Sequence, residues 1–216
     1  MSSGWIAADW PAPDGIIAGT TLRDGDNELP ARPRFLNQVH GAAVARWQDV
    51  QSGQPAPAAD AIVSDQPGSL CVVRTADCLP VLLCARDGSE IAAVHAGWRG
   101  LAAGVIEAAV EALQTPSAEL LAWFGPAISQ PAFEVGSEVR EAFCAVSAEA
   151  AAGFEQNDRG RWQADLYLLG RQRLAAAGVE AVFGGGLCTH ADPERFYSYR
   201  RDGSTGRMLS FVYKPT

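Results

Sequence analysis

Three residues of this chain, His40, Cys78 and His95, have side chains that could act together in one chemical site. They occur in the short stretches NQVHG, TADCLP and AVHAGWRG. Imidazoles and a thiolate are ligands that Zn²⁺ favours, and a thiol with an imidazole is also the pattern of a cysteine nucleophile and its base. Their separations exceed those of the zinc-finger and HExxH motifs, so spacing alone does not establish a shared site. The alternative is two histidines satisfied by backbone carbonyls and one packing cysteine.

Each of the three residues stands where a predicted strand gives way to a turn. Strand ends at one edge of a sheet can bring residues that are distant in sequence into one cleft. This placement is compatible with a common site for His40, Cys78 and His95, and the alternative of two core-edge histidines and a packing cysteine stays open. Asp77, the neighbour of Cys78, could orient a ligand or act as a general base, and it could equally cap the turn.

The stretch GWRGLAAG after His95 predicts an anion site. Gly97 and Gly100 allow a tight turn from strand to helix, and we expect the helix to begin at about residue 100. The first free N–H groups of that helix, beside the guanidinium of Arg99, would suit a phosphate. The alternative is that Trp98 and Arg99 only cover the edge of the sheet.

A local excess of basic residues lies near the end of the chain, in RFYSYRRDGSTGR. Arg195, Arg200, Arg201 and Arg207 stand there beside two tyrosines, and together they could hold a small anion. The competing interpretation is a solvated turn that is braced by salt bridges.

The elements that must position these residues are short strands followed by helices. Runs rich in Val, Leu and Ile and bounded by Gly, Pro, Asp or Ser predict strands at 16–20, 42–47, 60–64, 69–74, 80–85, 91–96, 120–125, 179–184 and 208–214. Helical periodicity appears at 100–114, 137–146 and 165–178, the last with Asp165 as its cap and Gly178 as its stop. Early strands and later helices favour an α+β fold, a mixed β-sheet core with packed helices, over strict βαβ alternation.

Composition and charge limit the class of protein. The 216 residues, 48% of them hydrophobic, suit a single domain, 1–216, with its own core. A net charge of −8 with 17 Lys+Arg argues against a nucleic-acid partner, because phosphate backbones are bound by basic clusters. We expect no membrane span and no secretion signal, since the start MSSGWIAADW lacks the basic and apolar regions of such a signal. Five cysteines without paired spacing predict reduced thiols and a cytoplasmic location.

Several motifs together carry a resemblance to a known family. In order they are NQVHG, ADAIVSD, RTADCLPVLL, AAVHAGWRG, FGPAI with FEVG, and CT followed by FYSYRRDGSTGR. From about Asn37 to Val212 the chain resembles the YfiH family, also called the laccase-domain, polyphenol oxidase or purine nucleoside phosphorylase family, or peptidoglycan editing factor. The resemblance implies a fold similar to that of the Cys-His toxin deamidases. It also implies a metal site formed by His40, Cys78 and His95, with Zn²⁺ bound and copper as the other possibility.

The activity that this resemblance implies is phosphorolysis of purine nucleosides. Adenosine, inosine and methylthioadenosine would react with phosphate, and deamination of adenosine would be a side activity. Four residues would be catalytic: Asp77, Cys78, His95 and Arg99. Four would bind the small-molecule nucleoside or the phosphate: Arg23, Gln38, Ser198 and Arg200. The protein would act as a monomer or a homodimer.

Two departures from the family pattern concern the pocket. Leu22 is inserted before Arg23 in GTTLRDG, and the segment from there to NQVHG is short for the family, which predicts a shorter pocket wall. Gln130 and Pro131 stand where many members carry a further cysteine. Chemistry that needs that additional thiol is therefore not expected here.

Two other classes of function stay open at the level of sequence. A cysteine amidase or hydrolase would use Cys78 as nucleophile and His95 as base, with a peptidoglycan precursor or a glutamine amide as substrate. A binding protein would only hold a nucleotide or a metal ion. Oxidation of phenols by copper is disfavoured, because three histidines are too few for a trinuclear cluster and a blue-copper centre together.

Overall fold

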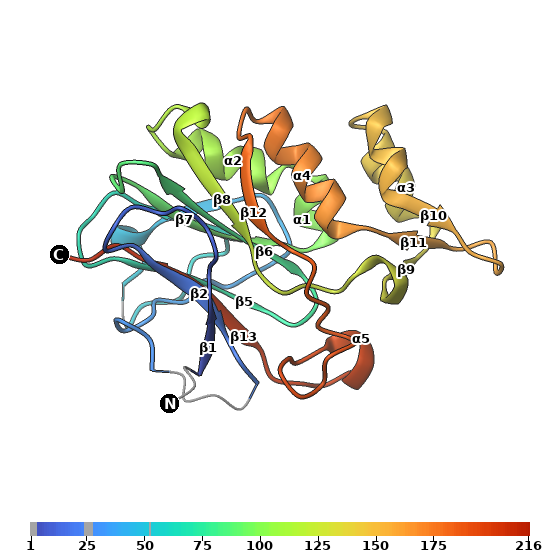
Figure 1. Cartoon of the computed structure of the whole chain (residues 1–216), viewed down its shortest axis with the longest axis horizontal. Helices are drawn as coiled ribbons and strands as arrows, with labels where there is room; N and C mark the ends of the chain where they lie inside the picture. Colours follow the sequence, from blue (N-terminus) through green and yellow to red (C-terminus); the bar gives the residue numbers. More distant parts are fainter. Residues whose placement is uncertain (1–3, 24–27, 52) are drawn as a thin grey trace.

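The computed structural model describes residues 4–23, 28–51 and 53–216. Within them the chain forms three layers: helices, a six-stranded sheet and a four-stranded sheet (Figure 1). A small three-stranded sheet stands to one side of these layers. The expected α+β class, a mixed sheet with packed helices, is confirmed.

The six-stranded sheet carries the candidate site. In order across the sheet its strands are β12 (Ala181–Gly184), β8 (Leu120–Phe124), β6 (Leu79–Ala85), β7 (Ile91–Ala96), β4 (Ala61–Ser64) and β3 (Val44–Arg46). The central pairs are antiparallel, whereas the outermost pair at each edge is parallel. All residues of β6 and β7 are buried, which explains their unbroken apolar sequences LPVLLCA and IAAVHA.

The four-stranded sheet is antiparallel and packs beneath the six-stranded sheet (Figure 1). Its strands, in order, are β1 (Trp5–Ala7), β2 (Ile17–Thr21), β13 (Met208–Tyr213) and β5 (Leu70–Thr75). Alternate residues of β5 point into the space between the sheets, where Cys71 and Val73 pack with Leu82 of β6 in a fully buried cluster.

Helices cover the other face of the six-stranded sheet. They are α1 (Trp98–Ala102), α2 (Val105–Ala112) and α4 (Leu166–Ala176), and their apolar residues form the largest core cluster with β6 and β7 (Figure 1). Short 3₁₀ turns occupy Trp47–Asp49, Ser117–Glu119, Gln130–Ala132 and Ala148–Gly153. Among the described residues, no helix has the length and the apolar composition that crossing a membrane requires.

The small sheet extends one end of the molecule. It consists of β10 (Phe154–Gln156), β11 (Trp162–Ala164) and β9 (Glu134–Val135), paired antiparallel in that order, with α3 (Ser137–Cys144) beside it (Figure 1). The last helix, α5 (Tyr199–Asp202), is a single turn just before β13. Sequence analysis did not predict β1, this sheet or α5, because elements of two to four residues carry too little periodicity.

The predicted helix at 100–114 is wrong in its bounds. Two helices stand there, and they are separated by Gly104, whose φ of 92° belongs to the left-handed region that favours glycine. The predicted helix at 165–178 is confirmed as α4. Its predicted cap is also confirmed, since the Asp165 carboxylate accepts a hydrogen bond from Leu168 N at 3.0 Å. Gly178, at φ 82°, follows its end.

Candidate metal centre

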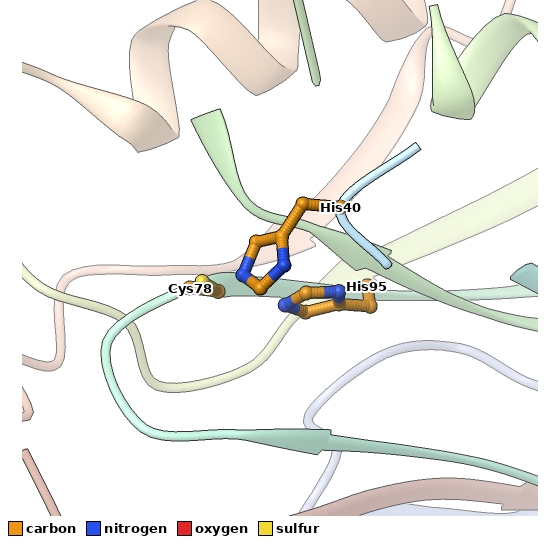
Figure 2. A group of neighbouring side chains, drawn as sticks. All are labelled: His40, Cys78 and His95. Carbon is orange, nitrogen blue, oxygen red and sulfur yellow. The ribbon is translucent and has the colours of Figure 1, made fainter. Parts of the chain in front are cut away.

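The fold brings His40, Cys78 and His95 into one cluster (Figure 2). Their ligand atoms all lie within 4.8 Å of one another, so one ion can contact all three. The ring centroids of the two histidines are 4.8 Å apart, and the rings meet edge to face at 76°. His40 comes from the loop before β3, Cys78 from the turn between β5 and β6, and His95 from the end of β7.

Strand register explains why residues so far apart in sequence meet. β6 and β7 pair with Pro80 opposite His95, so Cys78, which immediately precedes β6, lies at the same end of the sheet. On the other side of β7, the register with β4 puts Asp60, which immediately precedes β4, beside His95. Pairing of the two strands with β7 therefore builds the cluster at one sheet edge.

The Asp60 carboxylate holds both histidines in place. It is fully buried, and it accepts hydrogen bonds from the backbone N–H groups of Val39, His40 and Gly41 at 3.1, 2.9 and 2.7 Å. These three donors fix a turn in which His40 has a φ of 60°, a conformation that is uncommon for a residue with a side chain. Asp60 Oδ1 also lies 2.7 Å from His95 Nδ1.

The contact between Asp60 and His95 sets the tautomer of the imidazole. A carboxylate only accepts, so His95 Nδ1 carries the hydrogen and donates it. In the neutral ring, His95 Nε2 then presents its lone pair to the cluster, which is the arrangement of a metal-ligating histidine held by a carboxylate. The orientation of a ligand, which sequence analysis considered for Asp77, is therefore a feature of Asp60.

The groups of the cluster shift one another's pKa values. Burial raises the pKa of the Cys78 thiol, but hydrogen bonds and charges from His40 and His95 outweigh it and bring the pKa down to about 6. Burial lowers the pKa of His95, but hydrogen bonds to Asp60 and Cys78 outweigh it and raise the pKa to about 9. Burial also raises the pKa of Asp60, yet His95 and the backbone N–H groups hold it below its usual value. At neutral pH the metal-free cluster is therefore a thiolate beside an imidazolium.

Gly97 leaves the space that an ion in this cluster would need. A Cβ atom at this position would lie 2.9 Å from His40 Cδ2, 3.0 Å from Cys78 Sγ and 3.6 Å from His95 Cε1. The missing side chain thus opens a hollow among the three ligand residues. With two imidazoles, one thiolate and this hollow, the residues fit Zn²⁺ with one coordination position open.

We predict that Gly97→Ala will weaken metal binding on the order of tenfold to a hundredfold, the range seen when metal ligands lose their support. The backbone at Gly97, with φ −63° and ψ 156°, suits alanine, so the methyl group acts only by crowding His40 and Cys78. Competition with a chelator of known affinity measures the effect. Gly136→Ala is the matched control, since Gly136 also precedes a helix and its new Cβ would meet only the mobile end of Glu138. Equal zinc affinity in the Gly97 variant and the control would contradict the prediction.

The cluster lies in a cavity of about 740 Å³. Four arginines line the cavity, and Asp77 is the one acidic residue among the described residues that do so. The four are Arg74, Arg99, Arg200 and Arg207. The chain as a whole has a net charge of −8, so this excess of positive charge is local to the cavity and suits an anion.

The four arginines differ in how much of their bonding capacity the protein uses. The Arg99 guanidinium lies 4.4 Å from the Trp98 ring centroid and has no hydrogen bond or ion pair with the described residues. Arg200 Nη1 donates to the Glu134 carbonyl at 2.9 Å. Arg74 Nη2 donates to a loop carbonyl at 3.2 Å, and Arg207 Nη1 donates to two carbonyls of its own loop. Arg99 is therefore the freest cation in the cavity.

The predicted anion cradle at GWRGLAAG needs one correction. Helix α1 begins at Trp98 and has only five residues, so Arg99 and Gly100 lie inside it instead of preceding it. Gly97 has an extended backbone and is the residue between the end of β7 at Ala96 and the start of α1. The helix therefore begins earlier than the expected residue 100. Of this segment, Trp98 and Arg99 line the cavity.

Asp77 is occupied by the fold. Its Oδ1 accepts from Thr189 Oγ1 at 2.6 Å, and its Oδ2 accepts from Arg200 N at 2.7 Å. Its own backbone has a φ of 93° and its carbonyl accepts from Ile128 N. These contacts match the expected role of Asp77 as a residue that stabilises its turn, here by bonds to Thr189 and Arg200. None of the contacts reaches His40, Cys78 or His95.

Gln38 lines the cavity, and its side-chain amide forms two hydrogen bonds with the backbone of Arg74 in β5, as a paired strand would. Its Oε1 accepts from Arg74 N at 2.9 Å, and its Nε2 donates to Arg74 O at 2.8 Å. This pair of hydrogen bonds fastens the loop before His40 to β5. One amide N–H of Gln38 is left for a substrate.

Arg23 and Ser198 are not among the residues that line the cavity. The buried Ser198 hydroxyl accepts from Arg201 N at 3.2 Å, which caps α5. The Arg23 guanidinium lies 5.1 Å from the Tyr197 ring centroid and donates to the Pro193 carbonyl at 3.3 Å. Both residues brace the segment that carries α5.

The sequence patterns did not mark Asp60 or Arg74 as residues of the site, whereas Arg207 belongs to the basic cluster that was expected to hold a small anion. The signal for Asp60 was present in ADAIVSD, where a carboxylate begins an apolar strand that is buried on both faces. A buried carboxylate needs several donors, which points to a structural or functional partner. No comparable signal marks Arg74, because its place in the cavity depends on the register of β5 against β13.

A family model described as multi-copper polyphenol oxidoreductase laccase matches residues 24–214. The purine nucleoside phosphorylase YfiH of Shigella flexneri is 46% identical over 96% of this chain and 98% of its own length. This chain belongs to the YfiH family. A purine nucleoside phosphorylase of Pseudomonas aeruginosa is 45% identical, over 98% of each chain. These alignments span 242 positions, more than the 216 residues here, so the relatives carry insertions.

Solved structures of the family have the same fold. A protein of Neisseria meningitidis superposes with a TM-score of 0.92 at 40% identity, and the match covers 99% of this chain and 100% of that one. YlmD from Geobacillus stearothermophilus superposes with a TM-score of 0.86 at 25% identity, over 100% and 98% of the chains. The shortened segment predicted before NQVHG includes residues 24–27, which lie outside the described residues.

Proposed function

We propose that this protein is a zinc-dependent purine nucleoside phosphorylase that acts on adenosine and inosine, and also on methylthioadenosine. The observation that carries the proposal is a His-Cys-His cluster inside a cavity lined by four arginines. In the reaction, a phosphate oxygen bonds to C1′ of the ribose and the bond from C1′ to the purine nitrogen breaks. The products are the free base, which takes up a proton, and ribose 1-phosphate from adenosine or inosine or the corresponding methylthio sugar phosphate from methylthioadenosine.

His40, Cys78 and His95 would hold the zinc ion. The thiolate cancels one of its two charges, so a bound zinc ion would supply a net positive charge that polarises a substrate oxygen. Two neutral imidazoles and one thiolate are the donor set of a catalytic site with one open position. The role of Asp60 is to keep His95 in the ligating tautomer and His40 in its turn.

The arginines would bind the attacking phosphate and keep it oriented. Arg99 is the first candidate, because the Trp98 ring holds its guanidinium in place and none of the described carboxylates pairs with it. Arg200 is the second, since its side chain lines the same cavity and has donors left after its bond to Glu134. The remaining amide N–H of Gln38 would bind the ribose or the base.

We predict that Arg99→Ala will raise the KM for phosphate and slow turnover, with the metal content unchanged. A lost charge-assisted hydrogen bond is worth roughly 1.5–3 kcal/mol, which corresponds to a tenfold to hundredfold weaker phosphate complex. Steady-state kinetics at varied phosphate, together with metal analysis, measures it. Arg195→Ala is a control, since Arg195 pairs with Asp192 on the surface and does not line the cavity. An unchanged KM for phosphate in Arg99→Ala would move the phosphate site to Arg200 and its neighbours.

The proposal is tested with purified protein of known metal content, incubated with adenosine or inosine in the presence and absence of phosphate. We expect base and ribose 1-phosphate to appear only when phosphate is present, and both to disappear after chelation of the metal. Base without ribose 1-phosphate would indicate a hydrolase instead. Ammonia from adenosine, independent of phosphate, would measure the proposed deaminase side activity.

One observation favours a second candidate function. The thiolate of Cys78 beside the imidazolium of His95 is also the resting state of a cysteine amidase or hydrolase, with Asp60 as the group that orients the base. Its substrate would be a peptidoglycan precursor or another amide. Full activity on such an amide after removal of the metal, with rapid alkylation of Cys78 that zinc does not slow, would favour this candidate.

A polyphenol oxidase is the weakest of the alternatives. The third histidine, His190, lies outside the cluster, so the described residues provide one site with two imidazoles and a thiolate. Multicopper oxidation needs several copper centres with many histidine ligands. If copper occupies the site, it would be a single ion.

A further inference from the structure

Among the described residues, five with large apolar or aromatic side chains line the cavity: Trp98, Ile128, Phe133, Leu166 and Tyr199. Ile128 and Leu166 are 1% and 2% exposed, so they close the wall without presenting a surface. Guanidinium groups lie over the aromatic rings of Trp98 and Phe133, at 4.4 and 5.3 Å from the ring centroids. Four of the five residues therefore have their contact surface covered by the protein itself.

Tyr199 is different, because its ring is open. The residue is 61% exposed, and no hydrogen bond, ring contact or cation joins its side chain to the rest of the described chain. Other tyrosines are tied into the fold: the Tyr167 hydroxyl has partners at Ala127, Gly125 and Leu187, and the Tyr197 hydroxyl donates to the Arg23 carbonyl. An aromatic side chain left uncovered in a cavity wall is a feature that calls for a ligand.

The backbone that carries Tyr199 is nevertheless firmly held. On one side the Ser198 hydroxyl caps the helical turn, and on the other Arg200 N donates to Asp77 at 2.7 Å. The Arg201 guanidinium then donates to the carbonyls of Thr189 and Phe196 at 2.8 and 2.9 Å. A flat apolar face on a fixed support provides contact area at a small loss of conformational entropy.

We infer that Tyr199 is the stacking surface for the planar base of the substrate and is a determinant of base affinity. The inference rests on the proposed phosphorolysis, since that reaction brings a purine into this cavity. The polar arginines suit the phosphate and the sugar, whereas an uncharged aromatic ring suits the face of a heterocycle. Tyr199 therefore recognises the purine base, which is the leaving group, and Arg99 binds the phosphate, which is the attacking group.

Kinetics in both directions separate these two parts. Tyr199→Ala should raise the KM for inosine in the forward direction and for hypoxanthine in the reverse direction, on the order of tenfold to a hundredfold, the usual worth of one base–aromatic stack. The KM for phosphate and for ribose 1-phosphate should stay at the wild-type value, and so should the metal content. Tyr199→Phe keeps the ring and should behave as the wild type, whereas Tyr199→Leu keeps apolar bulk without a flat face and should resemble the alanine variant.

The pattern of KM values decides the inference. An unchanged KM for inosine and hypoxanthine in Tyr199→Ala overturns it. Equal rises for the base and for phosphate also overturn it, because they would indicate a general disturbance of the cavity.

Calorimetric titration of inosine into the metal-loaded protein without phosphate separates this inference from the proposed reaction. If the wild type binds inosine and Tyr199→Ala binds it tenfold or more weakly, the stacking role stands even where no phosphorolysis is found. If the two proteins bind inosine equally, the stacking role is wrong while the reaction can still hold. If the wild type binds no inosine, both are overturned.

Discussion

Cys78→Ala will leave the purified protein without a bound metal ion and without activity. The two imidazoles that remain are too few to hold zinc firmly, since three protein ligands are the usual minimum of a catalytic zinc site. His40→Ala and His95→Ala should have the same two effects, because each also removes one of three ligands. Metal stoichiometry by mass spectrometry, measured beside activity in the same samples, provides the test.

The other four cysteines are internal controls: Cys71, Cys84, Cys144 and Cys188. Burial raises the pKa of the Cys71 thiol, and it raises that of Cys84 to about 12, so neither offers a thiolate at neutral pH. Their replacement by alanine should lower the free energy of unfolding by about 1–2 kcal/mol and leave the metal in place. The fold should also survive loss of the metal, because the buried core between sheets and helices does not depend on it. A full equivalent of zinc in Cys78→Ala would show that the proposed site is wrong.

Asp60→Asn will weaken both the metal site and the fold. The carboxylate accepts four hydrogen bonds, and an amide of the same shape has one acceptor oxygen and two N–H groups that would face backbone donors. Each buried donor that loses its partner costs roughly 1–3 kcal/mol of stability. His95 keeps at best an uncharged amide oxygen in place of the carboxylate, so its ring is held less firmly, which should lower zinc affinity on the order of tenfold to a hundredfold. Denaturant unfolding of the metal-free protein and a competitive zinc titration measure the two effects.

Glu90→Gln is the matched control for this variant. Glu90 is also a buried carboxylate, and it accepts from the backbone N–H groups of Gln114 and Thr115 and from the Thr115 hydroxyl. It lies at a different cavity from the metal cluster. Its substitution should lower stability in the same manner without changing zinc affinity. If both variants bind zinc equally well, Asp60 acts only on the fold.

Much of the fold could be predicted from local sequence because each element carried its own signal. Fully buried strands such as β6 and β7 appear as unbroken apolar runs, and α4 combines a capping aspartate with a glycine after its end. The prediction of one helix at 100–114 was wrong because glycine is tolerated inside a helix and also favours the left-handed conformation that ends one. In the structure Gly104 has the left-handed conformation and separates α1 from α2. Strands of two or three residues, as in the small sheet, are too short for an alternating pattern to stand out from chance.

The candidate site was likewise predictable in part: its residue types could be recognised in the sequence, but its contacts could not. Residue types and motifs identified His40, Cys78 and His95, since metal chemistry depends on which atoms are available. The partners of Asp60 and Asp77, the two aspartates near the cluster, could not be predicted from residue types. The register of β4 against β7 places Asp60 beside His95. Asp77 meets Thr189 only because a later segment of the chain folds back against the turn before β6.

The sequence by itself thus indicated the candidate ligand atoms, the α+β class and most strands. Only the tertiary structure decided which buried carboxylate serves the metal cluster, which arginines meet in one cavity, and which aromatic ring is left uncovered there. The reason is physical: donor chemistry belongs to a single residue, whereas burial, pairing and exposure belong to the packing of segments that lie far apart along the chain.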